Sequence, residues 1–257
     1  MKTLIAINNL TTIDQLAYAN HIQFFYRLGK EFPADYFALC NPRRMSIDKM
    51  RNFSARAAID HGFDYLMFVD DDVLLPFNAF KRLQMADKDI IAGITCIRGY
   101  PYHPMVFNFM GPLLGGPNTC HYMDDYLERA DSNGIVECDA IGFSCCLIKV
   151  DFLKKIEPPF FITGEHHTED IYFCARAKKE VAGTKIFADA LVRTAHILGS
   201  EVVEPFNLEA RKLFDEAVTP NIKELSAQAE LRKMLIDPKV LRKGDYEKHI
   251  KEEIFDK

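Results

Sequence analysis

Three consecutive aspartates, Asp70, Asp71 and Asp72, follow the apolar run YLMFV at 65–69 and precede the apolar residues VLLP at 73–76. Adjacent carboxylates repel one another, and the repulsion grows next to a low-dielectric core, so such a stretch requires a positive charge beside it. An Asp-x-Asp pair places two carboxylates on the same side of an extended turn. Hard oxygen ligands of this kind suit Mg²⁺ or Mn²⁺ ions that also hold phosphate groups. The sequence therefore predicts a divalent metal site at Asp70 and Asp72.

Three further interpretations of the acidic stretches are weaker than a metal site. An acidic cap of the helix expected near Pro76 would account for one carboxylate and not for three. The stretch FVDDDV (68–73) also resembles the strand-end Asp-x-Asp of haloacid-dehalogenase-type phosphatases, but the Gly-Thr that usually follows there is absent. The stretch HYMDDYL (121–127) resembles a reverse-transcriptase turn, yet this chain is short and acidic. A Mg²⁺-dependent phosphohydrolase stays open as an alternative function.

Short apolar runs alternate with amphipathic stretches in the first third of the chain, which predicts strands over 3–7, 35–40 and 65–69 and helices over about 12–29 and 46–61. This alternation is typical of an α/β fold with a mixed, mainly parallel sheet flanked by helices. In such sheets ligands bind at the carboxyl ends of the strands. The aspartates stand at that end of the third strand, and Asn8 follows the first.

The remaining sequence predicts further strands over 89–95, 105–109, 141–149, 185–189 and 191–196, with a helix over about 169–182. From Glu201 onward the chain is charged and helix-prone. We therefore expect one domain over 1–200 and a separate C-terminal helical tail over 201–257. The tail is too small for a core of its own, so it is expected to dock on the domain or to join copies into a homo-oligomer.

The composition excludes several classes of protein. With 48% hydrophobic and 27% charged residues, the chain has the balance of a globular protein. A formal charge of -5 argues against general nucleic-acid binding. No apolar run approaches the roughly 18 residues of a membrane span, and the N-terminus does not have the pattern of a secretory signal, so a cytoplasmic protein is expected. Seven cysteines without a CxxC pattern indicate neither a disulfide framework nor a zinc ribbon.

Three segments carry a resemblance to a known family. Residues 49–76 place Arg51 and Asn52 about twenty residues before the aspartates, 140–156 contain a glycine strand, and 158–199 contain a Glu-Asp helix followed by a strand with His196. In this order they resemble the GT-A nucleotide-sugar glycosyltransferases. The sequence departs from the family pattern where GEHH precedes the Glu-Asp pair and where ILG follows the histidine.

The resemblance implies a GT-A (Rossmann-like) fold and a metal-dependent transfer of sugar with inversion. The donor would be a nucleoside-diphosphate sugar, with a UDP-sugar expected, and the acceptor a hydroxyl of a glycan, a lipid-linked molecule or another compound. The expected cofactor is Mn²⁺ or Mg²⁺, which acts as a Lewis acid on the departing diphosphate. A non-catalytic nucleotide-sugar-binding protein on the same fold is the other alternative.

The resemblance also assigns roles to single residues. Asp72 would bind the metal directly, Asp70 would face the ribose or the metal, and His196 would be a further ligand, since neutral imidazole binds divalent ions. The donor-binding residues expected are Asn8, Thr11, Arg51, Asp70, Asp71 and Gly142. Asp71 is expected to matter less than its neighbours, because the middle residue of an extended Asp-x-Asp points to the other side.

Two acids on the helix that begins near Thr168 compete for the role of general base. The attacking hydroxyl must lose a proton, and a positioned carboxylate is the usual acceptor. Helical rows place Asp170 with Cys174 and Ala177, so Asp170 is predicted to point inward, with Glu169 on the other flank. We therefore predict Asp170 as the base and Glu169 as its rival. Alternatively, both acids only complement the positive end of the helix.

Overall fold

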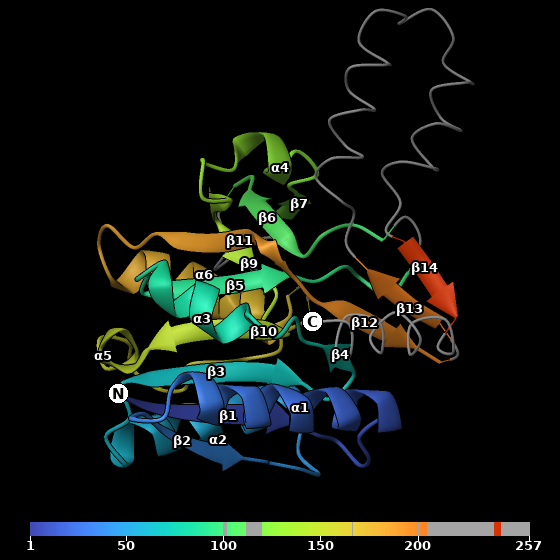
Figure 1. Cartoon of the computed structure of the whole chain (residues 1–257). Helices are drawn as coiled ribbons and strands as arrows, with labels where there is room; N and C mark the ends of the chain where they lie inside the picture. The colour runs from blue at the N-terminus through green and yellow to red at the C-terminus, as the bar shows by residue number, and fades with distance from the viewer. Residues whose placement is uncertain (100–101, 112–119, 166, 200, 205–238, 243–257) are drawn as a thin grey trace, which may run out of the picture.

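The computed structural model describes residues 1–99, 102–111, 120–165, 167–199, 201–204 and 239–242 of the 257-residue chain. Its centre is a seven-stranded sheet (Figure 1). From one edge to the other, the strands are β2 (Tyr36–Cys40), β1 (Lys2–Asn8), β3 (Tyr65–Asp70), β10 (Cys145–Lys149), β5 (Ile90–Ile94), β11 (Ile186–Arg193) and β8 (Ile135–Cys138).

Five of the seven strands run in the same direction. β1 is parallel to both β2 and β3, and β5 is parallel to β11. β10 is antiparallel to both β3 and β5, so β5 runs with β3, and β8 is antiparallel to β11 at the far edge. The predicted α/β fold with a mixed, mainly parallel sheet flanked by helices is confirmed.

Helices cover both faces of the sheet, which explains why most residues of the central strands are apolar. On one face lie α1 (Gln15–Glu31) and α3 (Ala79–Met85), whose Phe24 and Phe80 pack against Ile5 of β1 and its neighbours. The opposite face carries α2 (Ile47–Asp60), α5 (Val150–Leu153) and α6 (Glu169–Glu180), which pack against Phe68 of β3 and other residues of the larger core.

Two smaller sheets extend this body (Figure 1). One has the order β14 (Lys239–Arg242), β13 (Glu201–Glu204), β12 (Ala195–Leu198) and β4 (Val73–Leu74). The other has the order β7 (Cys120–Tyr122), β6 (Val106–Phe109) and β9 (Ala140–Ile141), with α4 (Tyr126–Arg129) beside it. Because β4 directly follows the three aspartates and pairs with β12, the first small sheet ties their turn to the strand that contains His196.

Two predicted strand boundaries are wrong. The stretch 141–149 is divided, because its first part joins β9 in the small sheet with β6, whereas β10 pairs with β3 and β5. Conversely, residues 186–193 form one strand that passes through Asp189. The buried Asp189 does not end this strand, because Arg82 donates two hydrogen bonds of 2.9 Å to its carboxylate.

Most of the segment after Glu201 lies outside the described residues. Its described parts are β13 and β14, which pair with each other, and β13 also pairs with β12. The domain boundary at 200, the helical tail and the homo-oligomer stay predictions. No helix in the described part of the chain combines the length and apolar character that crossing a lipid bilayer requires.

Candidate active site

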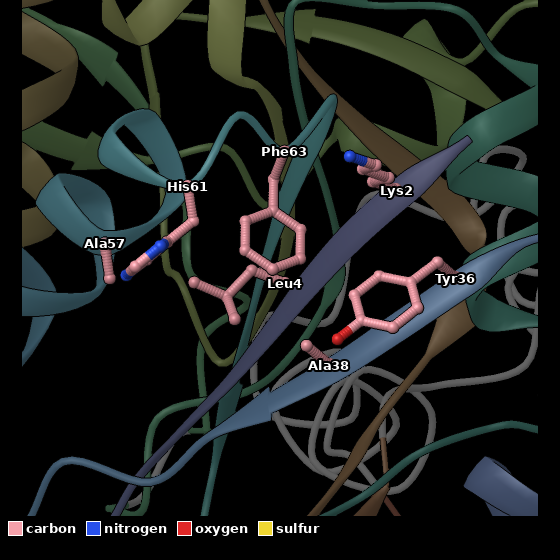
Figure 2. A pocket seen from close by; sticks show the side chains of 7 residues that line it. All are labelled: Lys2, Leu4, Tyr36, Ala38, Ala57, His61 and Phe63. Carbon is pink, nitrogen blue, oxygen red and sulfur yellow. The ribbon is translucent and has the colours of Figure 1, made fainter.

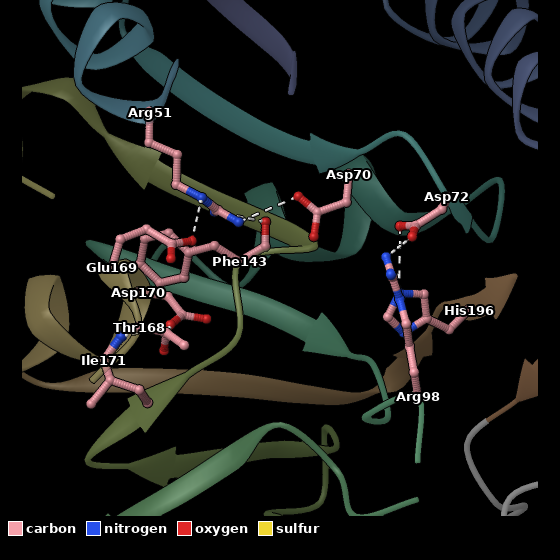
Figure 3. A network of polar contacts seen from close by, with 10 residues as sticks. All are labelled: Arg51, Asp70, Asp72, Arg98, Phe143, Thr168, Glu169, Asp170, Ile171 and His196. Atoms are coloured by element: carbon pink, nitrogen blue, oxygen red, sulfur yellow. Dashed lines mark hydrogen bonds and ion pairs between the residues drawn. The ribbon is translucent and has the colours of Figure 1, made fainter. Parts of the chain in front are cut away.

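A cleft of about 670 Å³ lies at the carboxyl ends of β1 and β3. Segments that are far apart in the sequence meet there, because several strands of the sheet end at this edge (Figure 3). Eight of the ten predicted site residues line the cleft, namely Asn8, Arg51, Asp70, Asp71, Asp72, Glu169, Asp170 and His196. Thr11 and Gly142 are not among its lining residues.

The turn that carries the aspartates is fixed from both sides. Asp70 N–H donates to the carbonyl of Ser144 at 3.1 Å, which holds the end of β3 against the neighbouring chain segment. Beyond the turn, Asn20 of α1 makes two hydrogen bonds to the backbone of Leu75, at 2.8 and 3.1 Å. His21 Nε2 donates to the carbonyl of Val73 at 2.9 Å. Burial lowers the pKa of His21 to about 4, so this clamp is uncharged at neutral pH.

Arg51 joins the aspartate turn to α6. Its Nη2 lies 3.3 Å from Asp70 Oδ1, its Nη1 donates to the carbonyl of Phe143 at 3.2 Å, and its Nε lies 3.0 Å from Glu169 Oε1. The Nε contact is an ion pair without hydrogen-bond geometry. Burial alone would lower the pKa of Arg51, but the charges of Asp70, Glu169 and Asp170 outweigh it and raise the pKa above its usual value. Arg51 is 3% exposed, so its positive charge acts on the carboxylates of Asp70 and Glu169 and not on solvent.

Glu169 is the most deeply buried acid of the cleft. It is 6% exposed, and burial raises the pKa of its carboxyl from 4.5 to about 7. Arg51 acts against this shift and Asp170 acts with it. Because a buried carboxylate is costly unless it is paired, the contact with Arg51 is what allows Glu169 to be charged at all. Glu169 is therefore a partner of Arg51 whose charge depends on pH near neutrality.

The two acids in the first turn of α6 are arranged differently from the helical-row prediction. Glu169 is the buried residue, whereas Asp170 is half-buried and faces the cleft. The prediction was wrong because both acids lie in the first turn, where burial depends on what packs against the helix end. Thr168 occupies the N-cap position, and its hydroxyl donates to the Asp170 carboxylate instead of capping a backbone N–H.

Asp72 and His196 meet on the other side of the cleft. Asp72 Oδ1 lies 3.4 Å from His196 Nε2. His196 Nδ1 lies 2.9 Å from the carbonyl of Cys96, and because a carbonyl only accepts, Nδ1 carries the proton and Nε2 carries the electron pair of the ring. Burial, together with the nearby charge of Arg98, lowers the pKa of His196 below its usual value. The imidazole is therefore neutral, which is the form that binds metals.

The chemistry of this pair fits a divalent metal ion. A carboxylate oxygen and an imidazole nitrogen are ordinary ligands of Mn²⁺, and their 3.4 Å separation suits neighbouring positions on one ion. In the described part of the chain, no three His, Cys, Asp or Glu side chains converge on one point. The remaining ligands would have to come from a substrate phosphate and water, as is common for Mg²⁺ and related ions. Asp70 is held by Arg51 rather than placed beside His196.

The other predicted binding residues differ in their positions. Asn8 is 4% exposed and lines the cleft, and neither polar atom of its side chain has a hydrogen-bond partner among the residues that the structure describes. Asp71 also lines the cleft, and burial together with Asp70 raises its pKa. Thr11 is exposed outside the cleft. Gly142 lies against Met105, where a Cβ would come within 2.8 Å of the Met105 side chain, so its place in the chain is explained by packing.

A second hollow differs in character. It lies near the opposite ends of β1 and β2 and is lined by Lys2, Leu4, Tyr36, Ala38, Ala57, His61 and Phe63 (Figure 2). None of the described residues that line it is a carboxylate. The first cleft, with its five carboxylates, is therefore the candidate active site.

Sequence reasoning missed two features of this cleft. Arg98 contacts both Asp72 and His196, and the carbonyls of Phe143 and Ser144 hold Arg51 and Asp70. Arg98 lies in the loop after β5, where neither spacing nor periodicity distinguishes it from other surface arginines. The carbonyls are backbone groups, for which the sequence carries no signal.

Comparisons with known proteins add a likeness of fold. No protein-family model and no curated protein matches the sequence. The structure of A197 from STIV is similar with a TM-score of 0.52 and 19% identity, over 79% of this chain and 90% of that one. The structure of GalNAc-T7 with UDP, GalNAc and Mn²⁺ is similar with a TM-score of 0.46 and 11% identity, over 77% of this chain and 44% of that one. The structure of UDP-glucose pyrophosphorylase with UDP-glucose is similar with a TM-score of 0.45 and 9% identity, over 76% of this chain and 93% of that one. At these identities the similarity concerns the fold, and the function has to be argued from the cleft.

Proposed function

We propose that this chain is a metal-dependent GT-A glycosyltransferase that moves a sugar, with inversion, from a nucleoside-diphosphate sugar to a hydroxyl acceptor. The observation that carries the proposal is one cleft with two chemically different ends. Asp72 and neutral His196 form one end, and Asp170 faces the cleft at the other (Figure 3). A metal-held diphosphate at the first end and an attacking hydroxyl at the second are what a sugar transfer requires.

The charges in the cleft support a donor that arrives with a cation. Five carboxylates and two guanidinium groups line it, so the cleft is acidic, and a free diphosphate would be repelled. Asp72 and His196 would hold Mn²⁺ or Mg²⁺, and the bound ion would neutralise charge on the leaving diphosphate. We take a UDP-sugar as the first donor to test. The unpartnered amide of Asn8 supplies a donor and an acceptor that fit a nucleoside.

Asp170 is proposed as the base that removes the proton of the acceptor hydroxyl. Its carboxylate faces the cleft, with Oδ1 accepting from the Thr168 hydroxyl and from Ile171 N–H, whereas Glu169 is paired with Arg51. A single base without a separate nucleophile corresponds to direct displacement, and therefore to inversion. Glu169 is proposed to position Arg51, and through it Asp70, without touching the acceptor.

Two variants on the same helix test this assignment. A general base contributes about 10²- to 10⁴-fold to the rate and little to donor affinity. Asp170→Asn should therefore bind UDP and Mn²⁺ like the parent and transfer sugar at least about a hundredfold more slowly, while Glu169→Gln should stay close to the parent rate. A thermal-shift screen of nucleotide sugars with Mn²⁺ identifies the donor first, because a ligand of the native state raises the melting temperature. If both variants keep full activity, the inverting mechanism with an enzymic base is wrong.

A further inference from the structure

Arg98 occupies the space between the two proposed metal ligands. Its Nη2 donates to Asp72 Oδ2, and its Nε donates to His196 Nε2 at 3.0 Å (Figure 3). Both contacts come from one guanidinium group in the loop that follows β5. The side chain of Arg98 is 58% exposed, so it can leave this position without disturbing the core.

The contact with His196 cannot coexist with metal binding. The Nδ1–H of His196 donates a hydrogen bond to the backbone carbonyl of Cys96, so Nε2 has a single electron pair. That pair accepts the hydrogen bond from Arg98, and a metal ion needs the same pair. A second conflict is electrostatic, since a divalent ion beside Asp72 would lie against the positive charge of the guanidinium. Metal binding therefore requires that Arg98 move away.

Arg98 also differs from the other arginine of the cleft. Arg51 is buried and held by two carboxylates and a carbonyl, so it is a fixed part of the site. The exposed Arg98 has partners that both belong to the proposed metal site. When it is displaced, its charge stays at the mouth of the cleft, where the diphosphate of a donor would lie.

On the basis of the proposed function, we propose that Arg98 is an exchangeable counter-cation. In the metal-free protein it neutralises Asp72 and holds His196, and when the metal and the donor bind it is displaced and contacts the diphosphate. The exchange explains how a chain with three adjacent aspartates keeps them stable without a metal. It makes the metal and the nucleoside diphosphate bind more strongly together than separately.

The test measures binding of Mn²⁺ and UDP separately, with free Mn²⁺ followed by electron paramagnetic resonance and UDP by calorimetry at saturating Mn²⁺. Arg98→Ala should bind Mn²⁺ alone about fivefold more tightly, the factor expected when one exposed ion pair no longer competes. The same variant should bind UDP at least about fivefold more weakly. A cleft that is merely damaged would lose affinity for both. Arg129→Ala is the matched control, because Arg129 at the end of α4 is 50% exposed and paired with Asp125 just before this helix.

Each of the remaining outcomes overturns a defined part of the proposal. Unchanged or weaker Mn²⁺ binding in Arg98→Ala, with the parent binding Mn²⁺, rejects the exchange and leaves the proposed function intact. Stronger Mn²⁺ binding with unchanged UDP binding rejects the contact with the diphosphate. If the parent, Arg98→Ala and Arg129→Ala all fail to bind Mn²⁺ even with UDP, the proposed function fails as well.

Discussion

The environment of the Glu169 carboxyl group predicts how the free energy of unfolding of this protein depends on pH. The change is Glu169→Gln, which keeps the shape of the side chain and removes its titration. Glu169 is 6% exposed and lies 3.0 Å from Arg51, and burial raises its pKa from 4.5 to about 7. An unfolded chain has no such burial, so its Glu169 should titrate near the ordinary value.

The sign and size follow from proton linkage. The folded state binds the proton more tightly than the unfolded state, so Glu169 stabilises the fold at low pH, and this stability is lost as the pH rises from about 4.5 to about 7. With these two pKa values, the contribution of Glu169 falls by about 2–3 kcal/mol between about pH 5 and about pH 8. Glu169→Gln lacks this contribution, so the stability difference between parent and variant should change by the same amount.

The assay is urea unfolding at a series of pH values for the parent and Glu169→Gln. The chain contains no tryptophan, so far-ultraviolet circular dichroism is the appropriate signal. Glu157→Gln, at an exposed position, controls for the loss of a surface carboxylate. Parallel pH curves for the parent and Glu169→Gln would refute the reasoning. They would mean that Arg51 compensates fully for burial and that Glu169 is ionised throughout.

The remaining predictions concern the metal end and the buried arginine. Asp72→Ala should abolish binding of both Mn²⁺ and UDP, because the two are proposed to bind as one unit. Asp71→Asn should weaken the binding of Mn²⁺ and UDP less. Calorimetry measures both affinities, with the parent protein as reference. Arg51→Met should lower the free energy of unfolding by about 3–5 kcal/mol, because it leaves buried carboxylates unpaired. Arg56→Met, on the exposed side of the same helix, is its control, and equal stability of the two variants would contradict the assigned role.

The sequence predicted the elements that carry the site better than the contacts within it. The apolar run before Asp70 indicates a buried strand. The carboxyl ends of neighbouring parallel strands lie at one edge of the sheet, so the sequence predicted that Asn8 and Asp70 lie close together. His196 was expected near Asp72 from the family resemblance, and the structure brings the two together through the antiparallel pairing of β12 with β4 in a smaller sheet, which the sequence did not predict.

The parts that could not be predicted depend on long-range packing. Glu169 and Asp170 are adjacent in the first turn of α6, and Glu169 is the one that is buried and contacts Arg51, which the helical period does not reveal. Arg98 lies 26 residues from Asp72 and 98 from His196, and it comes from a loop whose path no periodicity fixes. The stretch 141–149 reads as one strand, but its two parts pair with different sheets, which no local pattern reveals.

The most direct test of the proposed function is to identify the products that the protein forms from a UDP-sugar. Chromatography that resolves UDP, UMP, sugar phosphate and inorganic phosphate shows which bond is cleaved. We expect UDP release that requires Mn²⁺, stops with a chelator or in Asp72→Ala, and slows by about a hundredfold or more in Asp170→Asn. Release of UMP or inorganic phosphate would indicate a phosphohydrolase, and binding without any product from a full panel of nucleotide sugars and acceptors would indicate a non-catalytic binding protein. Either result would contradict the proposed transferase.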